Sequence, residues 1–205
     1  LDGGTGPVPG QIHVVSALGT LGGSEHQAIA LHGWLSRRRP ARLWSTVPPL
    51  PEYAAGCPVE TIDPANGRFP ESGHLIFVGP YFAYGDWLDR CRPDRVTVCF
   101  NTDLLETLIA RLVEFEEFPT RFRLDLTYPS DRFRRRHGLP GVVEYPLVDT
   151  ERFSPSGARA GRRGPLVVGR HSRDHADKFH PNDPALFRAL AADGHRLKVT
   201  GGRCL

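Results

Sequence analysis

The fold is decided by residues 11–38, QIHVVSALGTLGGSEHQAIALHGWLSRR. The β-like run at residues 11–16 leads into a loop, residues 18–24, that carries three glycines. A helix over residues 25–38 is predicted next, because its apolar positions recur every three to four residues. Ser24 is predicted to cap this helix, since a serine side chain accepts a hydrogen bond from the first helical amides. A strand, a glycine loop and a helix in this order are typical of a parallel α/β sheet.

The rest of the chain repeats this alternation. An extended loop is predicted at residues 48–51, because proline restricts both its own backbone and that of the residue before it. The sequence therefore predicts an α/β protein with a Rossmann-like parallel sheet flanked by helices. Further strands are predicted at 41–46, 59–62, 74–79, 95–100, 124–127, 142–145, 166–169 and 196–200, and further helices at 103–115, 129–137 and 184–193.

A domain boundary is predicted at residues 154–164, which are rich in Ser, Pro, Gly and Arg and nearly free of apolar residues. Residues 1–153 then form an N-terminal Rossmann-like domain, and residues 165–205 begin a second, incomplete one. Two strands and one helix are too few to close that second domain. The chain also begins at Leu1 and has no methionine, so we expect it to be a fragment of a longer protein.

The composition excludes several classes of protein. No stretch of the 205 residues approaches the 18 or so apolar residues of a membrane span. The four cysteines form no CxxC pair and fit no zinc spacing, so we expect no metal and reduced thiols in the cytoplasm. Cys99 lies in an apolar run and is predicted to be buried. A metal site at His171 and His175 is disfavoured, because no helix is predicted there.

Arginine supplies 24 of the 26 basic residues, and the net charge is +3. The runs at 37–39, 134–136 and 162–163 are interpreted first as solvated helix ends or linkers. An alternative is a nucleic-acid surface, but no aromatic RNA-binding motif accompanies them, so no nucleic-acid partner is expected. Peripheral contact with a membrane is a further alternative, for which Trp34, Trp44 and Trp87 are the candidates if they are not in the core.

Three segments have residue types suited to a binding site. Gly22, Gly23, Ser24 and Glu25 open the first helix, where backbone amides either approach an anion or simply make a tight turn. Asn101 and Asp103 follow a strand, where they either face the crevice at the carboxyl edge of the sheet or cap a helix. Arg170 and Lys178 follow a later strand, and their charges suit a diphosphate.

Taken together, these segments resemble the N-terminal part of a GT-B glycosyltransferase of the family 4 type. The resemblance is carried by the loop Gly22 to Glu25, by Val168-Gly169-Arg170 with Lys178, and by the block YPLVDTERFSP at 145–155. That block is similar to the Pro-Asn-Gly-Val-Asp-x-x-x-Phe-x-Pro hinge of the family, with Leu147 where Asn-Gly is usual.

The resemblance implies a retaining transferase that moves a sugar from a nucleotide-sugar to a glycan, lipid or small-molecule acceptor, without a cofactor or bound metal. Arg170 and Lys178 would steady the donor diphosphate, with Gly22 and Gly23 beside the sugar-phosphate. Ser24 and Glu25 are candidates for the acceptor loop. Asn101 and Asp103 are weak catalytic candidates, and the paired glutamates of the family would lie beyond Leu205. The fragment alone is then expected to be inactive. The alternative is a non-catalytic Rossmann-like binding module.

Overall fold

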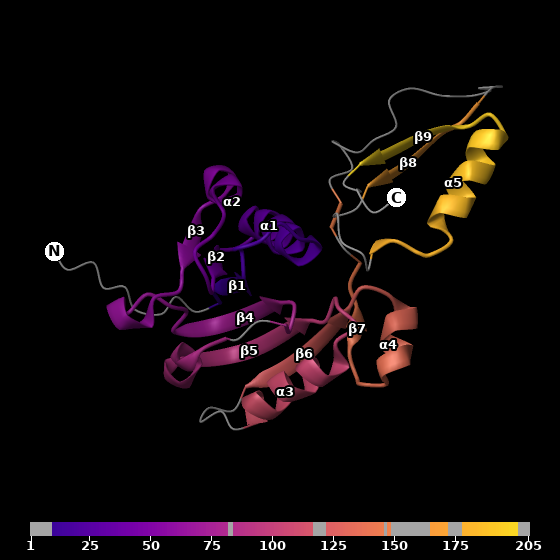
Figure 1. Ribbon diagram of the computed structural model, residues 1–205. Coiled ribbons are helices and arrows are strands. Elements are labelled where there is room, and N and C mark those ends of the chain that lie inside the picture. The colour runs from indigo at the N-terminus through magenta and orange to yellow at the C-terminus, as the bar shows by residue number, and fades with distance from the viewer. Residues whose placement is uncertain are drawn as a thin grey trace. The chain divides into compact units, whose positions relative to one another are not determined.

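In the described part of the chain, seven parallel strands form one sheet, which lies in the first of two compact units, residues 1–153 (Figure 1). The computed structural model describes residues 10–81, 84–116, 122–145, 147–148, 165–171 and 178–200. The sheet order is β3-β2-β1-β4-β5-β6-β7. Its strands are β1 (Ile12–Ser16), β2 (Ala41–Ser45), β3 (Val59–Thr61), β4 (Ser72–Val78), β5 (Arg92–Cys99), β6 (Arg123–Tyr128) and β7 (Val142–Val143).

Helices cover both faces of this sheet. On one face, α1 (Gly23–Ser36) and α2 (Pro51–Gly56) pack through residues such as Leu31 and Tyr53 against Val14 of β1. On the other face, α3 (Leu105–Glu116) and α4 (Asp131–His137) pack against the aromatic cluster around Phe77. Short 3₁₀ turns lie at η1 (Pro64–Asn66) and η2 (Asp86–Arg90). The predicted Rossmann-like α/β class is therefore confirmed.

All five residues of β1 are buried. This follows from its central position, because a parallel strand that is covered on both faces has no solvent side. Trp44 of β2 donates its indole N–H to Nδ1 of His13 at 2.9 Å, so the one polar ring within β1 has a partner. Trp44, Trp87 and Cys99 all lie in the core, whereas the side chain of Trp34 on α1 is exposed.

The second unit, residues 154–205, is described by itself. Its described strands, β8 (Val167–His171) and β9 (Arg196–Thr200), are parallel neighbours, and α5 (Asp183–Ala192) joins them. Within the described residues it therefore has the two strands and one helix that the sequence predicts. The predicted linker at 154–164, most of the hinge-like block at 145–155, and residues 172–177 with His175 lie outside the described residues.

One local prediction was wrong and another was right only in part. Helix α1 begins at Gly23 and not at residue 25, so Gly22 is its N-cap and Ser24 is already helical. Residues 48–50 form a loop as predicted, with Leu50 extended, but Pro51 already opens the short helix α2. Proline is favourable at the first helical position, where its missing N–H would have no partner in any case.

Helix α3 offers a matched test of this packing. Leu108 is fully buried, whereas Leu104, just before the helix, is about half exposed. We expect Leu108→Ala to lower the free energy of unfolding by about 2–4 kcal/mol, because it leaves a cavity in the core. Leu104→Ala should change it by less than about 1 kcal/mol. Urea unfolding followed by tryptophan fluorescence measures both; equal losses would contradict the packing described above.

Burial also makes the first unit sensitive to acid. Burial, helped by Arg42, lowers the pKa of His13 to about 4, and burial with Arg95 lowers that of His74 to about 4. An unfolded histidine binds its proton near pH 6.5, so acid favours the unfolded chain in the window between pH 6.5 and 4.

We therefore expect the urea midpoint of the first unit to fall steadily as pH drops from about 6.5 to about 4. In His13→Asn, whose amide oxygen can still accept from Trp44, the fall should be shallower, because one of the titrating rings is gone. All three tryptophans lie in the first unit, so their fluorescence follows the transition. A midpoint that is independent of pH would refute the expectation.

Candidate functional site

The candidate site lies where the sheet changes its direction of winding, between β1 and β4. These strands are parallel neighbours, but the chain leaves β1 toward β2 and leaves β4 toward β5. The two loops at their carboxyl ends therefore diverge, and in open α/β sheets ligands bind in the crevice that this divergence leaves. The loop at residues 17–22 and the segment after β4 line this edge of the sheet.

The glycine loop is shaped by close approach and not by a left-handed backbone. Gly22 is extended, with φ −160°, a conformation open to any residue. A Cβ there, however, would collide with the carboxylate of Glu25, which turns back over the start of α1. A Cβ on Gly23 would meet nothing within 4 Å. A side chain at position 22 would therefore displace the Glu25 carboxylate, whereas Gly23 borders open space.

Glu25 is the central charged group of this edge. Its residue is only 4% exposed, and its Oε1 accepts hydrogen bonds from the hydroxyls of Thr20 (3.1 Å) and Tyr81 (3.3 Å). Tyr81 can come this close because Gly79 has φ +90° and a side chain there would strike the Tyr81 ring. The carboxylate sits at the positive end of the α1 dipole. It thus takes the position at which an external anion would bind a helix N-terminus.

Asn101 joins the loop after β5 to the first turn and a half of α1. Its Nδ2 donates to Oγ of Ser24 at 3.0 Å and to Oε1 of Gln27 at 2.8 Å. Its Oδ1 is buried and has no hydrogen-bond partner among the described residues. A buried amide oxygen without a partner is costly and marks a place where a donor would be welcome. Asn101 therefore combines a structural contact with an open acceptor.

Asp103 has a different environment. Its carboxylate pairs with Arg136 at 2.6 Å and with Nε2 of His137 at 3.1 Å, both in the last turn of α4. The structure therefore brings Gly22, Ser24, Glu25 and Asn101 together, whereas Asp103 is tied to a helix on the other face of the sheet.

Sequence reasoning missed three members of this cluster: Thr20, Gln27 and Tyr81. Thr20 lies within the glycine loop, Gln27 lies in α1, and Tyr81 follows the buried strand β4. The available signal was the position of Tyr81 just after the predicted strand at 74–79, which the structure places beside β1. Polar groups at the ends of adjacent parallel strands share one edge of the sheet.

In the second unit, the side chain of Arg170 on β8 contacts residues of the same unit. Its guanidinium pairs with Asp183, donates to the carbonyl oxygen of Lys178, and lies 4.5 Å from the centre of the Phe179 ring. The His180 amide and Arg170 lower the pKa of Asp183 below its usual value. The backbone of Lys178 is thus a direct neighbour of the Arg170 guanidinium at the segment that leads into α5, and a shared diphosphate site of the two side chains stays a prediction.

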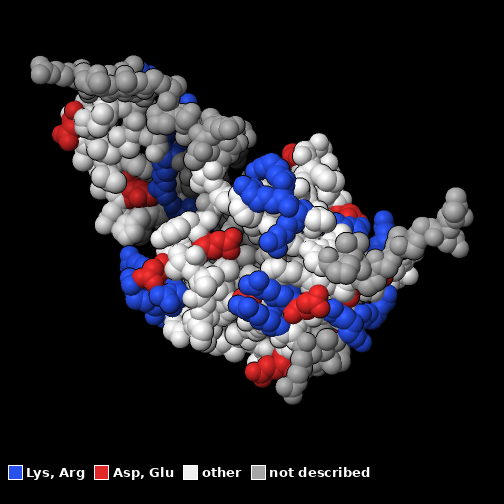
Figure 2. Space-filling view, turned by 180° about the vertical axis from the view of Figure 1, so that it is seen from behind, with Lys and Arg blue, Asp and Glu red and all other residues white. Residues whose placement is uncertain are grey.

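The arginine runs differ in their surroundings. In the run at the end of α4, Arg134 and Arg135 pair with Asp131, and Arg136 pairs with Asp103. Each arginine of that run therefore has a carboxylate partner in its own surroundings, as expected of a solvated helix end. On the face seen in Figure 2, basic side chains nevertheless cover more of the surface than acidic ones. The run at 162–163 lies outside the described residues.

The described residues contain no group of three or more His, Cys, Asp or Glu side chains placed to hold a metal ion. In the same part of the chain, no helix has both the length and the apolar character to cross a membrane.

The geometry defines a Rossmann-like α/β unit with a cluster of polar side chains at its switch point. Comparison with protein-family models, with curated proteins and with solved structures returned no match.

The link between Asn101 and α1 can be measured. We expect Asn101→Ala and Gln27→Ala each to destabilise the first unit by about 0.5–2 kcal/mol, because each removes one partner of the 2.8 Å hydrogen bond. The double variant should lose less than the sum of the two, with a coupling energy of about 0.5–1.5 kcal/mol. Urea unfolding of the four proteins measures the coupling. Strict additivity would show that the contact contributes nothing.

Proposed function

We propose that the chain is part of a retaining glycosyltransferase that moves a sugar from a nucleotide-sugar to an acceptor. In this proposal the first unit binds the hydroxyl-rich acceptor at the crevice between β1 and β4, and the second unit binds the donor diphosphate. The proposal rests on the family 4 resemblance of the sequence together with the chemistry of the crevice.

The observation that carries the proposal is the set of polar groups at the crevice. Glu25 supplies a buried carboxylate that accepts from the hydroxyls of Thr20 and Tyr81. Asn101, which is bound to Ser24 of the same helix, supplies an amide oxygen without a partner among the described residues. Carboxylate and amide oxygens accept hydrogen bonds, and hydroxyls both donate and accept. Such a set suits a ligand with several hydroxyl groups, such as a sugar.

The arrangement also divides the predicted roles between the two units. Because the carboxylate of Glu25 covers the start of α1, a phosphate beside Gly22 and Gly23 would meet a negative charge. The diphosphate role of these two glycines stays a prediction. Arg170 and Lys178 have the opposite charge, and a guanidinium binds phosphate oxygens in a bidentate manner. We therefore assign the diphosphate to Arg170 and Lys178.

The alternative is a non-catalytic binding module. Its support is that Arg170 already has an internal carboxylate partner, Asp183, and an internal carbonyl partner, Lys178. An arginine held in this way stabilises its own unit whether or not a ligand binds. The two functions differ in one respect: in the transferase, the Arg170 guanidinium leaves its internal partners and binds a phosphate of the donor.

A titration with nucleoside diphosphates and nucleotide-sugars tests the proposal. We expect Arg170→Ala to weaken binding by about tenfold or more, because a charge-assisted hydrogen bond to phosphate is lost. Arg188→Ala, an exposed arginine on α5, is the matched control and should bind like the unaltered chain. Calorimetry measures the affinities, and circular dichroism checks that each variant is folded.

A second variant separates a ligand role from a structural one. Asp183→Asn removes the charged partner of Arg170, so the guanidinium is freer to bind phosphate and affinity should be kept or increased. If Arg170 acts only within its own unit, Arg170→Ala and Asp183→Asn will both lower stability and leave affinity unchanged. No binding of any nucleotide would favour the binding-module alternative.

A further inference from the structure

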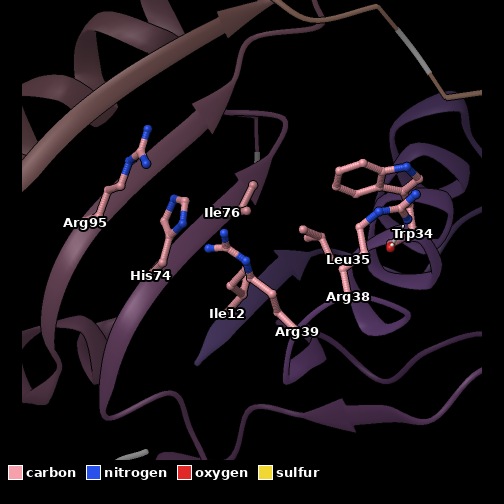
Figure 3. Close-up of a pocket in the computed structure, with 8 residues that line it drawn as sticks. All are labelled: Ile12, Trp34, Leu35, Arg38, Arg39, His74, Ile76 and Arg95. Atoms are coloured by element: carbon pink, nitrogen blue, oxygen red, sulfur yellow. Dashed lines mark hydrogen bonds between the residues drawn. The ribbon is translucent and has the colours of Figure 1, made fainter. Parts of the chain in front are cut away.

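A hollow lies away from the polar cluster of the candidate site, in the first unit. It has a volume of about 310 Å³ and is formed between the C-terminal end of α1 and the strands β1, β4 and β5 (Figure 3). Ile12, which lines it, is the first residue of β1, and Ser16 is the last, so four strand steps separate them, a distance of roughly 13 Å. The hollow is therefore distinct from the crevice. We call it the arginine groove.

The floor of the groove is apolar. Ile12, Leu35 and Ile76 line it, and each is less than 9% exposed. Trp34 forms one wall, and 39% of this residue is exposed to solvent, unlike Trp44 and Trp87. A pocket with an apolar floor and one exposed aromatic wall suits the body of a small organic molecule. Its volume lies at the lower end of the range for ligand pockets.

The rim of the groove is basic. Of the eight lining residues, three are arginines and none is acidic. Arg38 lies over the Trp34 ring at 4.0 Å and donates to the Trp34 carbonyl oxygen at 2.9 Å. Arg39 has no side-chain hydrogen bond or ion pair within the described residues, and Figure 3 shows it reaching from the end of α1 toward Ile12 and His74.

Charge compensation within the groove is incomplete. Arg95 pairs with Asp125 at 2.6 Å, but Asp125 also pairs with Arg123, so one carboxylate serves two guanidinium groups. His74 is bound to Oγ1 of Thr97 at 2.8 Å, and its lowered pKa keeps it neutral at pH 7. The arginines at the end of α4 also share carboxylates, Asp131 and Asp103, whereas within the described residues Arg38 and Arg39 have no carboxylate partner. The groove therefore keeps an excess of positive charge above an apolar floor.

We infer that the arginine groove is a binding site for a small organic anion with an apolar or planar body. The body packs on Trp34 and the aliphatic floor, and the acidic group, a carboxylate, sulfonate or phosphate, binds the guanidinium groups of Arg39 and Arg95. A charged group bound to a guanidinium at the rim of a dry pocket adds directional hydrogen bonds to apolar burial. This inference is independent of the proposed sugar transfer.

The probe is 1-anilinonaphthalene-8-sulfonate, a planar aromatic body with one sulfonate that stands in for the natural acidic group. We expect saturable binding of one molecule per chain, detected by its fluorescence and by energy transfer from tryptophan. Its neutral relative N-phenyl-1-naphthylamine lacks the sulfonate and should bind at least about fivefold more weakly. Equal affinity of the two probes would overturn the inference, because charge would then play no part.

Two neighbouring arginines provide the matched variants. Arg39→Ala should weaken binding of the sulfonate probe by about fivefold or more and leave the affinity for the neutral probe unchanged. Arg37→Ala removes the same charge two residues earlier in the sequence, from a residue that does not line the groove, and should change affinity by less than about twofold. An equal loss of affinity for the sulfonate probe in both variants would show that only the general surface charge matters. No loss of affinity in Arg39→Ala would exclude the groove as the binding site. Unfolding curves confirm that the variants are folded.

Discussion

The central position of β1 is the constraint on which the first unit depends. Its five buried residues pair with β2 on one side and with β4 on the other, both parallel. Parallel strands need crossover connections, and these are right-handed in nearly all proteins. A chain that winds first toward β2 and later toward β5 must therefore place α1 and α3 on opposite faces. The same reversal separates the loops after β1 and β4, so the fold and the crevice have one cause.

The regular elements could be predicted because they depend on local pattern. The runs at 11–16, 74–79 and 95–100 are apolar in sequence and buried in the sheet, as central parallel strands must be. Element ends were less predictable, since they depend on neighbours. Ser24 has the chemistry of a cap, yet its hydroxyl accepts from Asn101, 77 residues away, and Gly22 takes the cap position because Glu25 fills the adjoining space.

The location of the candidate site could be predicted from the sequence, but the side-chain contacts within it could not. Glycines between a strand and a helix are compatible with an anion site and with a tight turn, because both favour residues without a side chain. The structure shows a third use: Gly22 makes room for a carboxylate of the same chain. That contact depends on Tyr81 and Thr20 holding Glu25 in place. No pattern in the glycine loop specifies these partners, since Tyr81 lies 56 residues away in sequence.

The arginine runs of the described residues differ in whether their charges have carboxylate partners. Base composition can supply arginine anywhere, but it does not decide which arginines receive a carboxylate. At the end of α4 each arginine has one, at positions 131 or 103, so those charges serve the helix end. At the end of α1 the arginines instead border an apolar hollow without an acidic lining residue. Because an unneutralised charge beside a dry surface attracts a partner of opposite charge, local compensation distinguishes a structural arginine run from a binding one.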